Sequence, residues 1–169
     1  MTRFGTLVVL VAIAAAPVSA AYSAESSAPR AAKAPAKAGD ALIERGRYLV
    51  QIAGCNDCHT PGYAQSGGKV EEKLWLTGET LGWRGPWGTT YAANLRLSLQ
   101  PMSENGWIQY ARSAKMRPPM PWFALRDMTE DDLRALYRYI KSRPVAGDRV
   151  PAYVPPGQAP KGPYVQFPG

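Results

Sequence analysis

The chain has 169 residues, a length at which one domain is the default, and its 46% hydrophobic content excludes wholesale disorder. Two cysteines exclude a disulfide-rich scaffold, and a single histidine excludes a metal cage built from several histidines. The 20 Lys and Arg residues exceed the 13 Asp and Glu residues, for a formal charge of +7. Because these basic residues are scattered, they favour acidic protein surfaces as partners and not a nucleic acid.

Residues 1–20 resemble a cleaved secretory signal. Arg3 precedes an apolar run from Leu7 to Ala16, and small residues follow that run. The alternative is an uncleaved membrane anchor, but the run is shorter than the about 20 residues that a spanning helix needs. We therefore expect an exported protein, periplasmic in a bacterium, with no membrane span after cleavage. Residues 21–39 are rich in Ala, Lys and Pro and are expected to form a flexible linker.

A first helix is expected from Asp40, which can cap it, up to the region of Cys55. Its apolar residues fall on one helical face. Gly46 lies inside this helix and costs about 1 kcal/mol relative to Ala. Close approach of another helix would explain that cost, and simple tolerance of the glycine is the alternative.

Two further helices are indicated by their first residues. Ser103 can cap a short helix. Thr129 and Asp132 have the spacing of a capping box, and they precede an apolar pattern of period 3.6 that ends before Pro144. This last helix has the strongest local signals in the chain.

Three segments have no helical pattern. Residues 61–94 are rich in Gly and Trp, show no lasting periodicity and are expected to be a long loop that wraps something. Three prolines between residues 115 and 121 forbid regular structure there. Residues 144–169 are rich in proline and are expected to form an extended tail that lies over the domain or projects from it.

The pattern C-x-x-C-H spans Cys55 to His59 and contains every cysteine and histidine of the chain. It is the attachment sequence for c-type haem. Two thiols at this spacing can form thioethers with the two vinyl groups of one porphyrin edge, and the following imidazole can ligate the iron.

Other uses of this pattern fit the sequence less well. A thioredoxin-like redox site would follow a strand, whereas a helix is expected before Cys55. A zinc site lacks a fourth ligand of the usual kind. A disulfide between Cys55 and Cys58 is compatible with export but gives His59 no role.

No second histidine is available to ligate the iron from the side opposite His59. The sixth iron position is therefore occupied by a methionine, another weak donor or water, or is empty. Downstream of residues 1–20 the chain offers four methionines. Met120 lies between two prolines in a stretch that cannot be helical, where a rigid loop can present its thioether. We favour Met120, and Met116 is the next candidate. The other two are Met102 and Met128, each beside the start of a predicted helix.

From about Ala41 to Arg143 the sequence resembles the class I c-type cytochromes, of the monohaem bacterial kind. The resemblance rests on four motifs: G-R-Y-L at 46–49, C-N-D-C-H-T-P at 55–61, M-P-W from Met120, and the helix pattern at 128–140.

The resemblance implies an all-α cytochrome c fold over 40–143, with three to five helices and long loops that wrap one covalently attached haem c. It implies thioethers at Cys55 and Cys58, His59 as the proximal iron ligand and Met120 as the distal ligand. A loop similar to residues 85–95 lies near the haem propionates in related cytochromes. The residues that this similarity proposes for propionate contacts are Trp87, Tyr91, Asn94 and Arg84.

The expected function is single-electron transfer between redox proteins in the periplasm, with no catalytic residue in this chain. The expected partners are a donor dehydrogenase and an acceptor cytochrome or oxidase with acidic docking faces. One alternative is a cytochrome subunit of a periplasmic dehydrogenase complex, in which residues 144–169 serve for docking. A third possibility is a haem enzyme or gas sensor whose sixth iron position is open.

Overall fold

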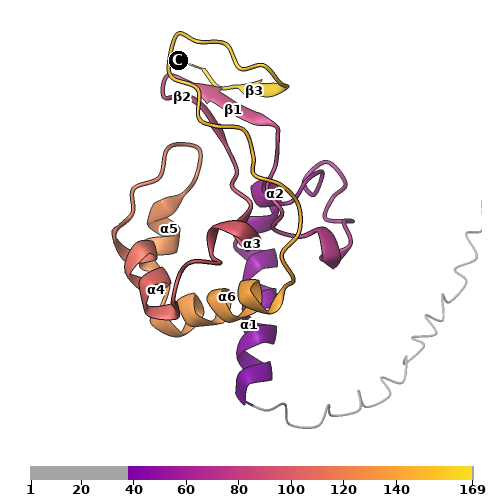
Figure 1. The fold of residues 1–169 in the computed structure, drawn as a ribbon, viewed down its shortest axis with the longest axis vertical. Helices are drawn as coiled ribbons and strands as arrows, with labels where there is room; N and C mark the ends of the chain where they lie inside the picture. The colour runs from indigo at the N-terminus through magenta and orange to yellow at the C-terminus, as the bar shows by residue number, and fades with distance from the viewer. Residues whose placement is uncertain (1–37, 169) are drawn as a thin grey trace, which may run out of the picture. The chain divides into compact units, whose positions relative to one another are not determined.

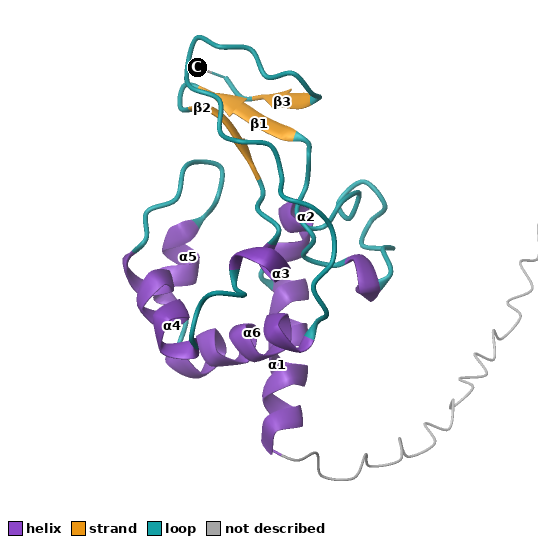
Figure 2. Ribbon diagram, viewed as in Figure 1, coloured by secondary structure: helices purple, strands orange, loops and turns teal. Residues whose placement is uncertain are grey.

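The structure is a computed structural model that describes residues 38–168. The signal sequence expected at 1–20 lies outside the described residues, and so does the expected linker except for its last two residues, which belong to the first helix. Figures 1 and 2 show the arrangement of the elements. The helices are α1 (Ala38–Ile52), α2 (Cys55–His59), the 3-10 helix η1 (Glu72–Leu74), α3 (Leu95–Ser98), α4 (Glu104–Ser113), α5 (Trp122–Asp127) and α6 (Glu130–Ser142). The strands are β1 (Gly82–Gly85), β2 (Gly88–Tyr91) and β3 (Tyr164–Gln166).

The crossing of α1 and α6 forms the centre of the helical part (Figure 1). A Cβ atom on Gly46 would lie 2.6 Å from the Cβ of Tyr139 and closer still to the carbonyl oxygen of Ala135. The expected close approach of a second helix at Gly46 is therefore confirmed. The helix α1 begins two residues earlier than expected, so Asp40 lies in its first turn and not before it.

The core consists of apolar side chains from the long helices and from the loop that follows α2. Its central members on α1 and α6 are Leu49, Val50, Leu133, Leu136 and Ile140, each at most 5% exposed. Others are Trp75, Leu76, Leu99, Trp107, Ala111, Leu125, Ala135 and Tyr139.

Of the three predicted helix caps, those at Ser103 and Thr129 are present, whereas Asp40 lies inside its helix. The Ser103 hydroxyl accepts a hydrogen bond from the Gly106 amide at 3.1 Å at the start of α4. The Thr129 hydroxyl accepts one from the Asp132 amide at 3.2 Å at the start of α6. The Asp132 carboxylate accepts a hydrogen bond from Nε of Arg45 at 2.9 Å, and this bond adds a polar tie between α6 and α1.

A three-stranded sheet in the order β2-β1-β3 was not predicted from the sequence. Strands β1 and β2 form an antiparallel hairpin, in which Trp83 pairs with Thr90. Strand β3 comes from the tail and pairs with β1 in parallel, with Val165 opposite Trp83. The expected mostly helical architecture is confirmed, and the sheet is an addition to it.

The tail lies over the domain, which is one of the two arrangements expected from its composition. The Asn94 amide donates to the carbonyl oxygens of Ala146 and Asp148, at 2.8 and 3.2 Å. Farther along, Val154 forms an antiparallel bridge with Thr89. Among residues 38–168, no helix is long and apolar enough to cross a membrane.

Candidate haem site

The helix α2 carries the two thiols and the imidazole of the C-x-x-C-H motif. It follows α1 through Gly54, whose φ of 71° is left-handed and favours glycine. Cys55 and Cys58 are three residues apart on this one helix and therefore face the same side of it. Both cysteines are free.

The two thiols differ from those of a thioredoxin-like site. Burial raises the pKa of Cys55 to about 11, and burial also raises the pKa of Cys58. A redox-active C-x-x-C lowers the pKa of its attacking thiol. A helix, and not a strand, also precedes the motif. Both observations favour thiols that are reserved for covalent attachment.

The imidazole of His59 is oriented by the backbone. Its Nδ1 lies 2.7 Å from the carbonyl oxygen of Ala93. A carbonyl oxygen only accepts hydrogen bonds, so Nδ1 carries a proton. In the neutral ring Nε2 then keeps its lone pair for a metal. Burial lowers the pKa of His59, against a smaller opposing effect of this hydrogen bond, so the neutral ring is favoured.

Buried hydrogen bonds fix α2 against the segment that follows it. The Thr60 hydroxyl donates to Oδ1 of Asn56 at 2.7 Å and accepts from the Leu76 amide at 2.8 Å. The Gly78 amide donates to the carbonyl oxygen of His59 at 2.8 Å. The motif is thus held on a rigid support, as a site that orients a metal ligand requires.

Burial does not distinguish between the four methionines that are candidates for the distal iron ligand. Met102, Met116, Met120 and Met128 are all partly buried and pack against the core. Met116 and Met120 lie in the loop between α4 and α5, and this loop is tied to β2 because the Thr90 hydroxyl donates to the carbonyl oxygen of Pro118 at 2.8 Å. The choice of Met120 stays a prediction.

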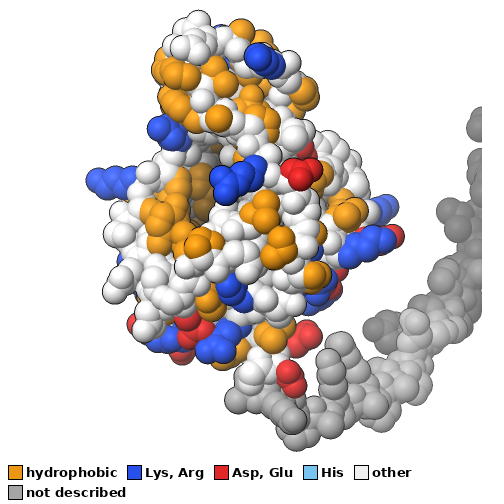
Figure 3. Space-filling view, in the orientation of Figure 1, with side chains coloured by type: hydrophobic (Ala, Val, Ile, Leu, Met, Phe, Trp, Pro, Cys, Tyr) orange, Lys and Arg blue, Asp and Glu red, His pale blue; other side chains and the backbone are white. Residues whose placement is uncertain are grey.

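A hollow with a hydrophobic interior opens on the face shown in Figure 3, and Lys and Arg side chains lie at its rim. In the same orientation, Figure 1 places the α4–α5 loop on one side of this hollow and the β1–β2 hairpin on the other. An apolar recess of this kind suits the body of a porphyrin.

The residues expected near the propionates lie on or beside the hairpin. The indole N–H of Trp87 donates to the carbonyl oxygen of Trp83 at 3.2 Å. Tyr91 is half-buried at the end of β2, and the guanidinium of Arg84 lies 5.3 Å from the ring centroid of Tyr164.

Asn94 is buried, and its side chain is bonded within the protein. Its oxygen accepts from the Leu97 amide at 3.1 Å and caps α3, and its NH₂ group donates to two carbonyl oxygens of the tail. The amide therefore connects α3 to the tail. A role for these residues at a propionate stays a prediction.

Trp83 is a candidate that the sequence did not single out. Its indole N–H is buried and has no hydrogen-bond partner within the described residues. Its neighbour across the hairpin, Thr90, contacts the loop of Met120. A buried and unpaired N–H donor is costly unless an acceptor reaches it, and a haem carboxylate is an acceptor of that kind.

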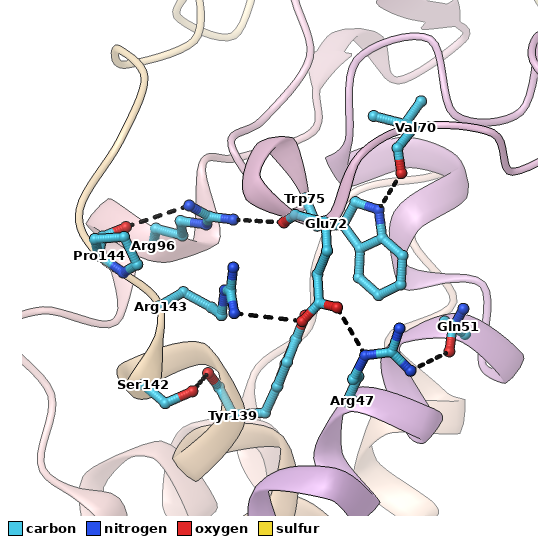
Figure 4. Close-up of polar contacts among 10 residues, drawn as sticks. All are labelled: Arg47, Gln51, Val70, Glu72, Trp75, Arg96, Tyr139, Ser142, Arg143 and Pro144. Carbon is cyan, nitrogen blue, oxygen red and sulfur yellow. Dashed lines mark hydrogen bonds and ion pairs between the residues drawn. The ribbon is translucent and has the colours of Figure 1, made fainter.

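A charged cluster around η1 was also missed from the sequence. Figure 4 shows the carboxylate of Glu72 between Arg47 and Arg143. Glu72 accepts from Nε of Arg47 at 2.8 Å, from the Tyr139 hydroxyl at 2.9 Å and from Arg143 at 3.3 Å. Burial acts to raise the pKa of Glu72, but the hydrogen bonds and charges around it prevail and lower it.

Arg96 joins the same cluster to the start of the tail. It is 1% exposed, and its guanidinium donates to the backbone oxygens of Glu72 and Pro144, at 3.1 and 3.3 Å. Burial and the charge of Arg143 lower its pKa. The cluster fixes η1, α1, α6 and the tail relative to one another, and no local sequence pattern connects its members.

Taken together, these residues fit a covalently attached haem. Two free thiols and an imidazole with a free Nε2 lie on one short helix, and a buried N–H group on the hairpin lacks an acceptor. Within residues 38–168, no three side chains of His, Cys, Asp or Glu gather in a way that would hold a bare metal ion.

Comparisons with known proteins agree with this fit. The family model described as Cytochrome c matches residues 43–144. The chain is 28% identical to a nicotinate dehydrogenase subunit of Pseudomonas putida, with 66% of this chain and 9% of that protein covered. It is 29% identical to the cytochrome c subunit of the quinone alcohol dehydrogenase of Gluconobacter oxydans, with 64% of this chain and 23% of that protein covered. The chain thus spans less than a quarter of either relative, and no solved structure gives a significant match.

The matched residues include the thiols, the imidazole and most of the helical core. Proteins of the matched family bind haem c covalently, and Cys55 and Cys58 have the spacing that this attachment requires. The chain belongs to the cytochrome c family.

Proposed function

We propose that this chain is an exported electron carrier with one haem, whose iron is ligated by His59 and Met120. The observation that carries the proposal is the oriented imidazole of His59, with Nδ1 bonded to Ala93 and Nε2 free, on the same short helix as two free thiols. Haem c, when bound, supplies a reversible one-electron change at its iron. The protein residues attach it, orient the proximal ligand and exclude water.

The ligand assignment is tested by the visible spectrum of the oxidised protein. We expect the weak charge-transfer band of a methionine–iron bond in the wild type. Met120→Ala should abolish this band, because the thioether is removed while the covalent attachment stays intact. Met116→Ala is the matched control, since Met116 lies in the same loop and is similarly half-buried. Loss of the band in Met116→Ala and its survival in Met120→Ala would assign the ligand to Met116.

An open sixth position would point to a different function. A haem enzyme or gas sensor of that kind would bind carbon monoxide readily in the untreated reduced protein. A carrier with methionine ligation would bind it poorly. Rapid binding in the wild type would therefore overturn the carrier proposal.

A second candidate function is that of a cytochrome subunit in a dehydrogenase complex. The names of both relatives favour it, because each is a dehydrogenase subunit. Gel filtration of a native extract, followed by haem absorbance, separates the two functions. A free carrier elutes at the mass of this chain alone, whereas a subunit elutes together with dehydrogenase activity at a larger mass.

A further inference from the structure

One residue of the tail reaches the loop that carries Met120. The Tyr153 ring lies against Arg117, with its centroid 3.8 Å from the centre of the guanidinium group. Arg117 belongs to the loop of residues 114–121, which joins α4 to α5. This is the shortest cation–π contact of the described residues, and it joins the tail to the 114–121 loop.

The position of Tyr153 is fixed by the hairpin. Its hydroxyl donates to the carbonyl oxygen of Trp87 at 2.7 Å. The next residue, Val154, exchanges two backbone hydrogen bonds with Thr89, at 2.8 and 3.0 Å. Gly88, with a φ of 94°, permits this packing, because a Cβ there would lie 2.9 Å from the Tyr153 hydroxyl. The ring is therefore presented to the loop by a rigid support.

The 114–121 loop has few other ties. Three of its residues are prolines and lack an N–H donor. Between residues 115 and 119, the one hydrogen bond to the rest of the described protein is the bond from the Thr90 hydroxyl to Pro118. Besides the packing of Met116 and Met120 against the core, the loop is therefore held by two side-chain contacts, one with β2 and one with the tail.

We propose that Tyr153 and Arg117 form a strap that holds the 114–121 loop closed, so that Tyr153 is a positioning residue for the distal iron ligand. The strap rests on the proposed function, in which Met120 is that ligand. If the loop opened, the Met120 thioether would move away from a bound haem, and an added ligand could take its place. The apparent affinity for an added ligand is then proportional to the fraction of molecules with an open loop.

The test is an imidazole titration of the full-length oxidised holoprotein, followed by its visible spectrum. A cation–π contact at a partly exposed site changes a population by about twofold to tenfold. We expect Tyr153→Leu to raise the apparent imidazole affinity on the order of fivefold. Arg117→Gln should do the same, and the double variant should show no further increase, because both substitutions remove one interaction.

Two matched variants separate the strap from general damage to the tail. Tyr164→Leu removes another exposed tail tyrosine that stacks on an arginine, in this case Arg84 of β1, and should leave the affinity unchanged. Tyr153→Phe keeps the ring over Arg117 and loses only the bond to Trp87, so its effect should be smaller than that of Tyr153→Leu.

Each outcome decides a different claim. Two results would overturn the strap, provided that the methionine–iron band is present in the wild type. One is an equal change in imidazole affinity for Tyr153→Leu and Tyr164→Leu. The other is additive changes in that affinity for Tyr153→Leu and Arg117→Gln. A wild type without that band, or a band that survives Met120→Ala, would overturn the ligand assignment and with it the role of the strap at the iron.

Discussion

Glu72 shows how a single side chain at the start of the short helix η1 can hold distant parts of the fold together. It receives hydrogen bonds from Arg47 on α1, Tyr139 on α6 and Arg143 just beyond α6. The carboxylate is partly buried, and its charge compensates two of the arginines around it. A group of this kind stabilises the fold only while it stays ionised.

Replacement of Glu72 by Gln should lower the free energy of unfolding by about 1–3 kcal/mol, because charge-assisted hydrogen bonds to two half-buried arginines are lost. Denaturant unfolding of the full chain measures this change. Glu71→Gln is the control, since Glu71 is exposed and, among residues 38–168, pairs only with Lys73. Similar losses for the two variants would contradict the assigned role of Glu72.

The same carboxylate makes stability depend on pH. The pKa of Glu72 is lower in the folded protein than in the unfolded chain, so its stabilisation is complete above its unfolded pKa. That stabilisation is lost as the pH falls through the folded pKa. Glu72→Gln should accordingly lose less stability than the wild type over the same acid range.

Single residues also mark the limit of prediction from sequence. Cys55, Cys58 and His59 were identified because their signal lies within five consecutive residues. Glu72 and Trp83 were missed, because their roles depend on neighbours that are distant in the chain. The hydrogen bonds of Glu72 and the lack of a partner for Trp83 appear only after folding.

At the scale of elements, the packing of α1 on α6 depends on Gly46. Gly46→Ala should lower the free energy of unfolding by about 1–3 kcal/mol, because the added methyl group overlaps the backbone of α6. Gly39→Ala is the matched control on the same helix, since nothing lies within 4 Å of a Cβ there. That variant should be as stable as the wild type or more stable by up to about 1 kcal/mol. An unchanged unfolding midpoint for Gly46→Ala would contradict the tight crossing.

Local signals explain which elements were predicted. The helix α6 was expected because its cap, its period and its terminating proline lie within one short stretch. The strands were not expected, because each has at most four residues and β1 finds one of its partners in the tail. A strand of three or four residues is too short to show an alternating pattern of polar and apolar residues. Its local sequence also gives no sign of a partner strand that lies far along the chain.

At the scale of the whole molecule, the proposed carrier function makes the excess of basic residues testable through encounters with a redox partner. We expect the rate constant for electron exchange with an acidic redox protein to fall on the order of tenfold as salt rises from low to physiological concentration. Stopped-flow mixing at several ionic strengths measures it. A basic redox protein serves as the control and should show the opposite trend. A rate constant independent of salt would contradict steering by charge.

The tail has a consequence for proteolysis. Lys161 is exposed and is followed by Gly162, where nothing lies within 4 Å of a Cβ position. Exposed segments of this kind are preferred cleavage sites. A protease specific for lysine that cuts there separates β3 from the rest of the chain, while Tyr153 stays attached to the domain. Cleavage there would therefore remove one edge of the sheet while the contact between Tyr153 and the 114–121 loop stays in place.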